Sequence, residues 1–394
     1  MRRSEPTGVN AARPVVRNRV LAVLVIGGLA AGLLLAFLTQ APNRLVTGTG
    51  VRLAELLDLR RAPLLLPVLG LVAAVFARPT RRLHAVAAVC AAVLLPAWFW
   101  LAGDQAARWA ETGSALSRTS FGAGFWLLVT LTALALADAL QRLQVVPTRR
   151  LLVAATMALV VFVLAAAGAL DALSLLKEYR NRQDVFDAAL WRHLQIVATT
   201  LLPTLVIGVP LGLAAFARPG PARAVFAVLN VIQTVPSIAL FALLIAPLSL
   251  LAAALPGLGI SGIGLAPAIV ALTLYSLLPV VRSVAAGLGQ VPPAVVDAAR
   301  GMGLTRAQVF WRVEAPLAFP LLLAGLRVCT VQTIGLAVVA ALIGAGGFGA
   351  IVFQGLASSA IDLVLLGVVP VVVLAALAEA LFGVAIAWFE GRTR

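Results

Sequence analysis

Ten apolar runs, separated by short loops that carry most of the charges, determine what this chain can fold into. A transmembrane helix needs about 20 predominantly apolar residues to cross roughly 30 Å of hydrocarbon. Charged residues make up 11% of the chain, whereas a soluble domain carries about 25%. The sequence therefore predicts an all-α integral membrane protein with about ten transmembrane helices. The expected spans are 20–39, 62–77, 83–102, 121–141, 150–170, 195–216, 223–246, 262–284, 316–343 and 362–388.

The charges also predict how these spans are oriented. If the amino terminus is cytoplasmic and every span crosses, the cytoplasmic segments hold 19 Arg or Lys and four acidic residues, and the outer segments hold 10 and nine. Such an excess of basic residues on one side is what the positive-inside rule requires. We therefore expect both termini in the cytoplasm. We attribute the net charge of +15 to the orientation of the chain in the lipid membrane, and we expect no nucleic-acid binding.

Polar segments divide the chain into parts. Residues 171–194 are the longest polar stretch after the first span, and we expect an extracytoplasmic linker there. Residues 44–61 alternate charges with leucines, a pattern typical of an interfacial amphipathic helix. The expected parts are a cytoplasmic tail (1–19), five spans (20–170), the linker (171–194), five further spans (195–388) that include a long cytoplasmic loop (285–315), and a second cytoplasmic tail (389–394).

The loop 285–315 has the pattern of two short helices joined by a turn. Pro292 and Pro293 suit a helix start, because proline has the φ angle of a first helical turn. Gly301 and Gly303 predict a stop after a helix over 294–302. Thr305 predicts the cap of a second helix over 306–313, ended by Pro316. A helix of about nine residues is marginal in water by itself, so we expect this one to dock on a partner.

The same loop resembles the EAA loop of binding-protein-dependent ABC importer permeases. The matching pattern is Asp297-Ala-Ala, three residues, Gly303, nine residues, Val313, two residues, Pro316. The chain has Asp297 where the pattern has Glu, and Ala315 where it has Leu. The resemblance implies that this helix inserts into a groove of a cytoplasmic ABC ATPase. The implied ATPase-coupling residues are Asp297, Ala298, Ala299, Arg300, Gly301, Gly303 and Pro316.

Residues 190–388 resemble the permeases of osmoprotectant importers, which move glycine betaine, choline, carnitine or proline. The resemblance is carried by Gln233-Thr-Val-Pro-Ser, Leu272-Thr-Leu-Tyr-Ser-Leu-Leu-Pro, Asp297-Ala-Ala-Arg-Gly-Met-Gly and Ala341-Leu-Ile-Gly-Ala-Gly-Gly-Phe-Gly. It implies a type I ABC importer permease bundle in a bacterial plasma (inner) membrane. The implied partners are an ATPase dimer, a second permease subunit (a paralogue or a second copy) and an extracytoplasmic solute-binding protein. The first 190 residues are not covered by this resemblance.

Polar residues within the spans are candidates for the transport pathway, although many such residues only bond across helices. Pro236 and Pro279 are expected to break their helices beside a cavity. Tyr275 and Phe241 offer aromatic faces that a quaternary ammonium substrate prefers. The candidates are Gln233, Thr234, Pro236, Ser237, Phe241, Tyr275, Gln332 and Thr333.

Two ionisable residues lie deep in the last two spans. Arg327 and Glu379 are costly there unless each faces a partner or a cavity, and we expect them to form an intramembrane ion pair. The pair can hold the helices together or contact the substrate, and the sequence leaves both roles open. His84 and His193 are too few and too far apart for a metal site on their own, and Cys90 and Cys329 lie inside apolar stretches, as small buried hydrophobic residues do.

Three classes of function are compared with the sequence: an ABC importer permease, a secondary transporter and a membrane enzyme. The glycine-rich segment 344–349 is not expected to bind a nucleotide, because a span and not a strand precedes it. The chain has no Gly-x-x-x-x-Gly-Lys-Ser/Thr motif, so it is expected to bind no cofactor itself and to leave ATP-Mg to a partner subunit. An ion-coupled secondary transporter with inverted five-helix repeats is the alternative. A membrane enzyme would need clustered acids, histidines or a nucleophile, and no such cluster occurs in the sequence.

Overall fold

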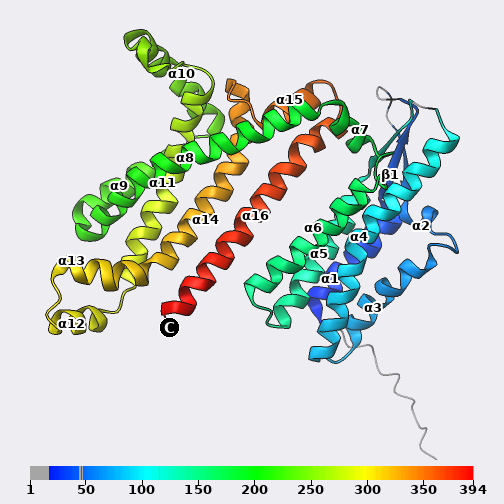
Figure 1. Cartoon of the computed structure of the whole chain (residues 1–394), viewed down its shortest axis with the longest axis horizontal. Coiled ribbons are helices and arrows are strands. Elements are labelled where there is room, and N and C mark those ends of the chain that lie inside the picture. Colours follow the sequence, from blue (N-terminus) through cyan, green and yellow to red (C-terminus); the bar gives the residue numbers. More distant parts are fainter. Residues whose placement is uncertain (1–16, 44–45, 47, 115, 394) are drawn as a thin grey trace, which may run out of the picture. The chain divides into compact units, whose positions relative to one another are not determined.

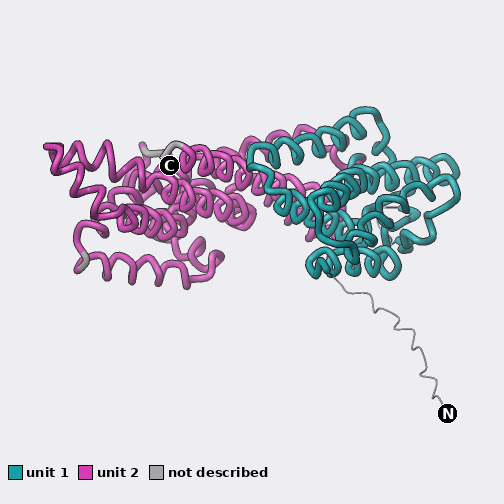
Figure 2. Tube along the Cα trace, turned by 90° about the horizontal axis from the view of Figure 1, so that it is seen from below, with its two compact units in different colours: residues 1–176 teal, residues 177–394 magenta. Residues whose placement is uncertain are grey.

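The computed structural model describes residues 17–43, 46, 48–114 and 116–393, and these form two compact units. Unit 1 comprises residues 1–176 and unit 2 comprises residues 177–394. Figure 1 shows the secondary structure along the chain, and Figure 2 colours the two units separately. The helix α7 (Ser174–Asn181) spans the boundary between the units. The amino-terminal tail expected at 1–19 lies, apart from its last three residues, outside the described residues.

Unit 1 is a helical bundle with a small sheet. Its helices pack through one apolar core that runs from Leu21 to Leu173. Glycines allow close approach between elements in this core, because a Cβ at Gly103 would lie 2.1 Å from the Ala169 carbonyl oxygen. The helices are α1 (Arg19–Leu34), α2 (Leu53–Leu56), η1 (Ala62–Leu64), α3 (Leu65–Phe76), α4 (Arg81–Thr112), α5 (Ala123–Arg142) and α6 (Pro147–Ala166).

The sheet is the one departure of the described residues from an all-α protein. It has three antiparallel strands in the order β2-β1-β3, with β1 (Ala36–Ala41) between β2 (Thr49–Arg52) and β3 (Arg118–Phe121). Phe37 of β1 is fully buried and contacts the rings of Trp98 and Phe125. The expected span 20–39 is therefore shorter than predicted, because the chain leaves the helix after Leu34 and pairs with β2 and β3.

Unit 2 is built around α11, the most deeply buried of the membrane-length helices among the described residues. It packs against α8, α9, α10 and α14. The approach of α8 is close, because a Cβ at Gly212 would lie 2.6 Å from the Cβ of Val284. The helices of this unit are α8 (Gln183–Ala217), α9 (Pro219–Thr234), α10 (Ser237–Ala254), η2 (Pro256–Leu258), α11 (Leu265–Gly289), α12 (Pro293–Gly301), α13 (Arg306–Val309), η3 (Phe310–Glu314), α14 (Ala315–Val339), η4 (Ala340–Ile343), α15 (Phe348–Ala357) and α16 (Ile361–Thr393).

Among the described residues, eight helices are long and apolar enough to cross a membrane. The predicted fold class is confirmed, but the number of full spans is smaller than ten. The segment expected at 20–39 contains α1, with 16 residues, and the start of β1, and the segment expected at 62–77 contains η1 followed directly by α3, with 3 and 12 residues. At about 1.5 Å per residue, α1 and the continuous run of η1 and α3 are about 24 Å and 23 Å long, less than the roughly 30 Å of hydrocarbon. The span expected at 223–246 is two helices, α9 and α10.

The structure corrects one further sequence prediction and describes the local structure of two other segments. The prediction of an amphipathic helix at 44–61 is wrong. The described part of this segment forms β2, one helical turn (α2) and irregular backbone, because β2 pairs with β1. The linker expected at 171–194 contains α7 and the first part of α8, so it is largely helical. The tail expected at 389–394 is not separate, because α16 continues to Thr393.

Candidate functional site

The loop 285–315 contains the helix–turn–helix pattern that its sequence predicts. The first helix, α12, ends in a Schellman motif, in which Gly303 N–H donates to Arg300 O (2.9 Å) and Leu304 N–H to Ala299 O (3.3 Å). Gly303 has φ +82°, a left-handed conformation that glycine adopts without a Cβ penalty. The second helix begins at a capping box, in which Thr305 and Gln308 exchange side-chain and backbone hydrogen bonds.

Pro316 does not end the second helix, as the sequence analysis expected. One turn of α-helix (α13) continues through a π-helical segment (η3) directly into α14. Pro316 lies in the first turn of α14, and the wider π-helical turn before it changes the hydrogen-bonding register there. Figure 1 shows α12 and α13 at the end of unit 2 where α16 also ends. The second half of the loop is therefore a helical extension of a membrane helix.

The residues of α12 divide between two faces. Val296 and Ala299 face inward and form an apolar cluster with Val291 and Val309. The side chain of Ala299 is only 2% exposed, so this alanine contacts its own loop and not a partner. Of the two alanines implied as coupling residues, only Ala298 is on the surface in this conformation. The buried face explains how so short a helix is held in place.

The outward face of α12 carries the remaining candidate residues. Asp297 and Arg300 are exposed and lie 3.7 Å apart at their closest charged atoms, one helical turn along the same face. Two large apolar side chains that the sequence analysis did not single out are also exposed in this loop. Met302 is 76% exposed and Trp311 is 71% exposed. The loop therefore presents charged and apolar side chains together on surface that the described chain leaves uncovered.

Pro236 breaks its helix as expected, and a side chain of α11 braces the break. The α9 helix ends at Thr234 and α10 begins at Ser237. The Tyr275 hydroxyl donates a hydrogen bond to the carbonyl oxygen of Val235, which lies between the two helices. This hydroxyl therefore fixes the broken segment to α11.

Pro279, in contrast, does not break its helix, and the prediction that it does is wrong. Proline has no N–H, so the carbonyl of Tyr275, four residues earlier in α11, loses its helical donor. The side-chain amide of Gln233 donates to that carbonyl at 2.8 Å. An external donor thus satisfies the group that Pro279 frees, and α11 continues through the proline from Leu265 to Gly289.

This arrangement predicts the effect of Gln233→Leu. The substitution leaves the Tyr275 carbonyl without a donor in a region where α11 is buried, which costs about 1–3 kcal/mol. We expect a lower thermal unfolding temperature for the purified chain. The matched control is Thr234→Val, because the Thr234 hydroxyl only donates within its own helix, to Val231 O (2.7 Å). An unchanged unfolding temperature in Gln233→Leu, together with altered uptake, would contradict this structural role.

The candidate pathway residues fall into two groups, one buried and one with accessible surface. Phe241, Tyr275 and Thr333 are buried, and both aromatic rings pack in the apolar cluster around α11. Thr333 Oγ1 donates to Cys329 O (2.8 Å) and lies 3.1 Å from Ser276 Oγ, so it bonds between α14 and α11. In this conformation these three hold the bundle together. The candidates that retain accessible surface are Gln233, Thr234, Pro236, Ser237 and Gln332.

The glycine-rich segment 344–347 is a tight turn between η4 and α15, and α8 holds it. Arg192 Nε donates to Ala345 O at 2.9 Å, and fully buried His193 lies beside the turn. Gly347 has φ +74° and ψ −167°, a combination that is essentially restricted to glycine, and a Cβ there would lie 3.2 Å from His193 Nδ1. Arg192 and His193 are not predictable from sequence as partners of this turn, because no local pattern links residues 192–193 to residues 344–347.

The two intramembrane ionisable residues form an ion pair. Arg327 Nη1 of α14 lies 3.1 Å from Glu379 Oε1 of α16, and these helices pack against each other. The Glu379 side chain is nevertheless 56% exposed. Within the part of the chain that the structure describes, no group of three or more His, Cys, Asp or Glu residues could hold a metal ion.

Comparisons with known proteins place this geometry in a family. The model described as "ABC transporter permease YehY, N-terminal domain" matches residues 17–176, and the model described as "Binding-protein-dependent transport system inner membrane component" matches residues 204–394. A solved structure of the MetNI methionine ABC transporter, in an inward-facing conformation, is 25% identical, and the similarity covers 53% of this chain and 98% of that chain with a TM-score of 0.47.

Curated relatives agree with the family models. The osmoprotectant import permease protein OsmW of Salmonella typhimurium is 38% identical over 185 residues, which cover 47% of this chain and 82% of the relative. The carnitine transport permease protein OpuCB of Listeria monocytogenes is 36% identical over 193 residues, covering 49% and 83%. Multi-pass permeases of such importers reside in the bacterial inner membrane. The chain belongs to the inner-membrane permeases of binding-protein-dependent ABC importers, in the osmoprotectant family.

Proposed function

We propose that this chain forms one half of the transport pathway of an ATP-driven importer for compatible solutes, and that it couples to a separate ATPase through α12. The observation that carries the proposal is the outward face of α12, where Asp297, Ala298 and Arg300 are exposed on a helix anchored from behind by Val296 and Ala299. Membership of the permease family disfavours the alternative of a secondary transporter. A secondary transporter needs no surface for an ATPase, whereas the permeases of this family work with one.

The exposed surface of the loop has the chemistry of a protein interface. Interface centres are enriched in methionine, aromatic residues and arginine, and Met302, Trp311 and Arg300 supply one of each. The continuous run from α13 through η3 into α14 gives a mechanical link from this surface to the membrane. Closure of two ATPase subunits around ATP-Mg would move α12, and α14 would transmit the movement to the bundle. The ATP chemistry belongs to that partner dimer.

A second permease subunit, either a paralogue or a second copy, is part of the proposal. The Glu379 side chain is 56% exposed although it lies within a membrane helix. Ionisable groups at such depth face a protein interior or a water-filled cavity, because exposure to lipid is costly. The exposed side of the Arg327–Glu379 pair is therefore covered by a second subunit or lines the pathway between two subunits.

The proposed substrates are glycine betaine, choline, carnitine and proline. Relatives are named as osmoprotectant, carnitine and choline permeases. The accessible residues at and near the α9–α10 break, Gln233, Thr234, Pro236 and Ser237, together with Gln332, are the proposed pathway contacts. An extracytoplasmic binding protein would select the solute and deliver it. The charge distribution favours an orientation with both termini in the cytoplasm, the side on which α12 would meet the ATPase.

Purification of the tagged chain from its native membrane tests this function. We expect it to retain an ABC ATPase and either a second permease or only itself, as identified by mass spectrometry. After reconstitution with its binding protein, uptake of one of the four solutes should require ATP and should persist without an ion gradient. Uptake by the chain alone, driven by an ion gradient, would overturn the proposal in favour of a secondary transporter.

A further inference from the structure

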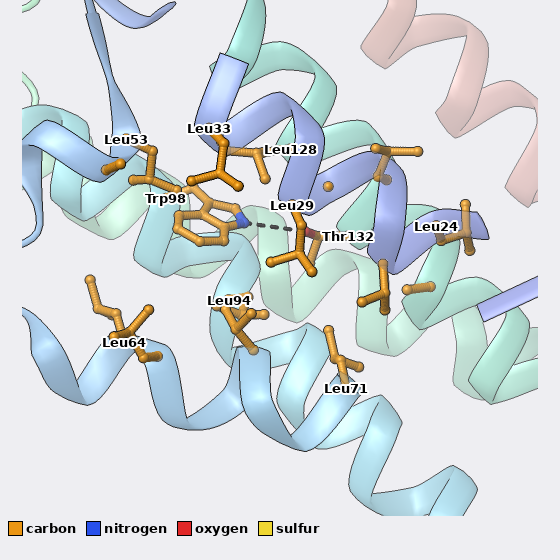
Figure 3. A pocket seen from close by; sticks show the side chains of 18 of the residues that line it. Leu24, Leu29, Leu33, Leu53, Leu64, Leu71, Leu94, Trp98, Leu128 and Thr132 are labelled. Carbon is orange, nitrogen blue, oxygen red and sulfur yellow. Dashed lines mark hydrogen bonds between the residues drawn. The ribbon is translucent and has the colours of Figure 1, made fainter. Parts of the chain in front are cut away.

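Unit 1 contains an apolar cavity for which the transport function supplies no role. Its volume is about 180 Å³, and it lies among α1, α2, α3, α4 and α5. Leucines of α1 (Leu29 and Leu33), of η1 (Leu64) and of α3 (Leu71) are among the side chains around it (Figure 3). A cavity of this size between packed helices is space that a ligand can fill.

The lining excludes polar ligands. Almost all of the lining side chains are leucine, valine, alanine or glycine. The two polar groups in the lining satisfy each other, since Trp98 Nε1 donates to Thr132 Oγ1 at 3.2 Å (Figure 3). A solute with a charged or hydrogen-bonding group would therefore lose its water contacts without gaining a partner, which is unfavourable. The cavity matches a hydrocarbon chain.

The cavity opens sideways, toward the surroundings of the bundle. Leu33 of α1 and Leu65 of α3 line it and are 56% and 42% exposed, so its wall is incomplete between these two helices. Both helices are shorter than the thickness of the hydrocarbon layer, as described above. At the depth of these apolar helices the surroundings of a membrane protein are the acyl chains of lipids. Hydrocarbon is thus the material that has access to the opening.

One end of the cavity lies next to a charged segment that suits the headgroup level of a membrane. Leu53 and Leu57 line the cavity, and the same segment carries exposed Asp58 and Arg60. The backbone N–H of Arg61 donates to the Asp58 carboxylate and lowers the pKa of that carboxyl. Exposed charges of both signs so close to an apolar opening match a zwitterionic headgroup.

We propose that the cavity binds a segment of one acyl chain of a membrane phospholipid, with the headgroup beside residues 52–60. The lipid enters between α1 and α3, and its chain packs against Trp98, whose side chain is buried in the bundle and lines the cavity. The lipid completes the apolar core of unit 1, where the two short helices leave it open. This inference concerns unit 1 alone and is independent of the solute that unit 2 transports.

Filling the cavity with a side chain tests the proposal. Gly28 lines the cavity, and a Cβ there would lie 3.8 Å from Leu128 Cδ2, an ordinary contact, so Gly28→Leu directs a side chain into the space. The matched control is Ala30→Leu, on the same helix at an exposed position outside the lining. Should Gly28→Leu fail to fold, Ala54→Phe fills the cavity from its rim on α2.

Two measurements on the full chain report occupancy. Native mass spectrometry in mild detergent with phosphatidylcholine should show one more retained lipid for the wild type and Ala30→Leu than for Gly28→Leu, with affinity at this site reduced about tenfold by the filling. Phosphatidylcholine brominated on its acyl chain should quench the fluorescence of Trp98. The Trp98 signal of the wild type and of each variant is the difference between its fluorescence and that of the same protein carrying Trp98→Phe. This quenching should fall in Gly28→Leu and persist in Ala30→Leu.

Equal lipid retention and equal Trp98 quenching in Gly28→Leu and the wild type would overturn the proposal. Displacement of the brominated lipid by millimolar glycine betaine would overturn it as well, because the cavity would then belong to the transported solute. Failure of the wild-type chain to support uptake of any of the four solutes, with lipid retention and Trp98 quenching as expected above, would contradict the transport proposal for unit 2 and leave the lipid site intact.

Discussion

Replacement of Gly303 by valine is expected to abolish ATP-driven uptake while the chain still inserts and folds. Valine at φ +82° costs about 1–2 kcal/mol or more, because its Cβ approaches the following carbonyl oxygen and its branching adds to the strain. A Cβ at this position would meet no other atom within 4 Å, so the effect is on the backbone and not on packing. The Schellman bonds to Arg300 and Ala299 would break, and the outward face of α12 would lose its orientation toward the ATPase.

The measurements for this variant are ATP-driven uptake in proteoliposomes, ATPase co-purification and the thermal unfolding of the membrane bundle. We expect uptake to fall more than tenfold and the ATPase to be lost, with the unfolding temperature of the bundle nearly unchanged. Gly289→Ala is the control, because Gly289 lies in the same loop outside the coupling residues, is helical and exposed, has open space around it and gains helix propensity as alanine. Normal uptake by Gly303→Val would contradict the assignment of α12 as the coupling helix.

The features that the sequence predicted correctly are local ones. The Schellman end of α12 and the capping box of α13 depend on residues within six positions of each other, so a glycine and a Thr-x-x-Gln pattern are sufficient signals. The break at Pro236 is local for the same reason. Apolar runs of about 20 residues likewise predicted most of the membrane helices, because the bilayer sets their length.

The features that the sequence did not predict depend on distant residues. Pro279 leaves α11 intact only because Gln233, 46 positions earlier, donates to the carbonyl that the proline frees. The expected span 20–39 stops at Leu34 because residues 36–41 pair with strands that follow later in the chain. The burial of Ala299 required knowing that Val309 folds back onto α12. No pattern within one segment reveals such contacts.

Reversal of either charge of the Arg327–Glu379 pair is expected to prevent stable assembly, and reversal of both to restore it. In Arg327→Glu two carboxylates face each other, and in Glu379→Arg two guanidinium groups do. An unpaired charge at the centre of a membrane helix costs about 2.5–3.5 kcal/mol on insertion scales, and like charges add to that cost. In the wild type, Arg327 Nη1 and Glu379 Oε1 lie 3.1 Å apart. The double variant places the same two charges opposite each other with their positions exchanged. The measurement is the yield of the intact complex from membranes by size-exclusion chromatography.

The same double variant separates the two roles that the pair can have. If the pair only holds α14 and α16 together, the double variant should recover both assembly and uptake, since an ion pair between the helices is present again. If the exposed side of Glu379 also faces the transported solute, assembly should recover while uptake stays low, because the positively charged ammonium group of the solute would then meet the positive charge that Glu379→Arg introduces. Arg327→Lys is the control that keeps the sign of the charge. Independent, additive effects of the two single reversals would contradict a direct pair, because residues that interact directly are not additive.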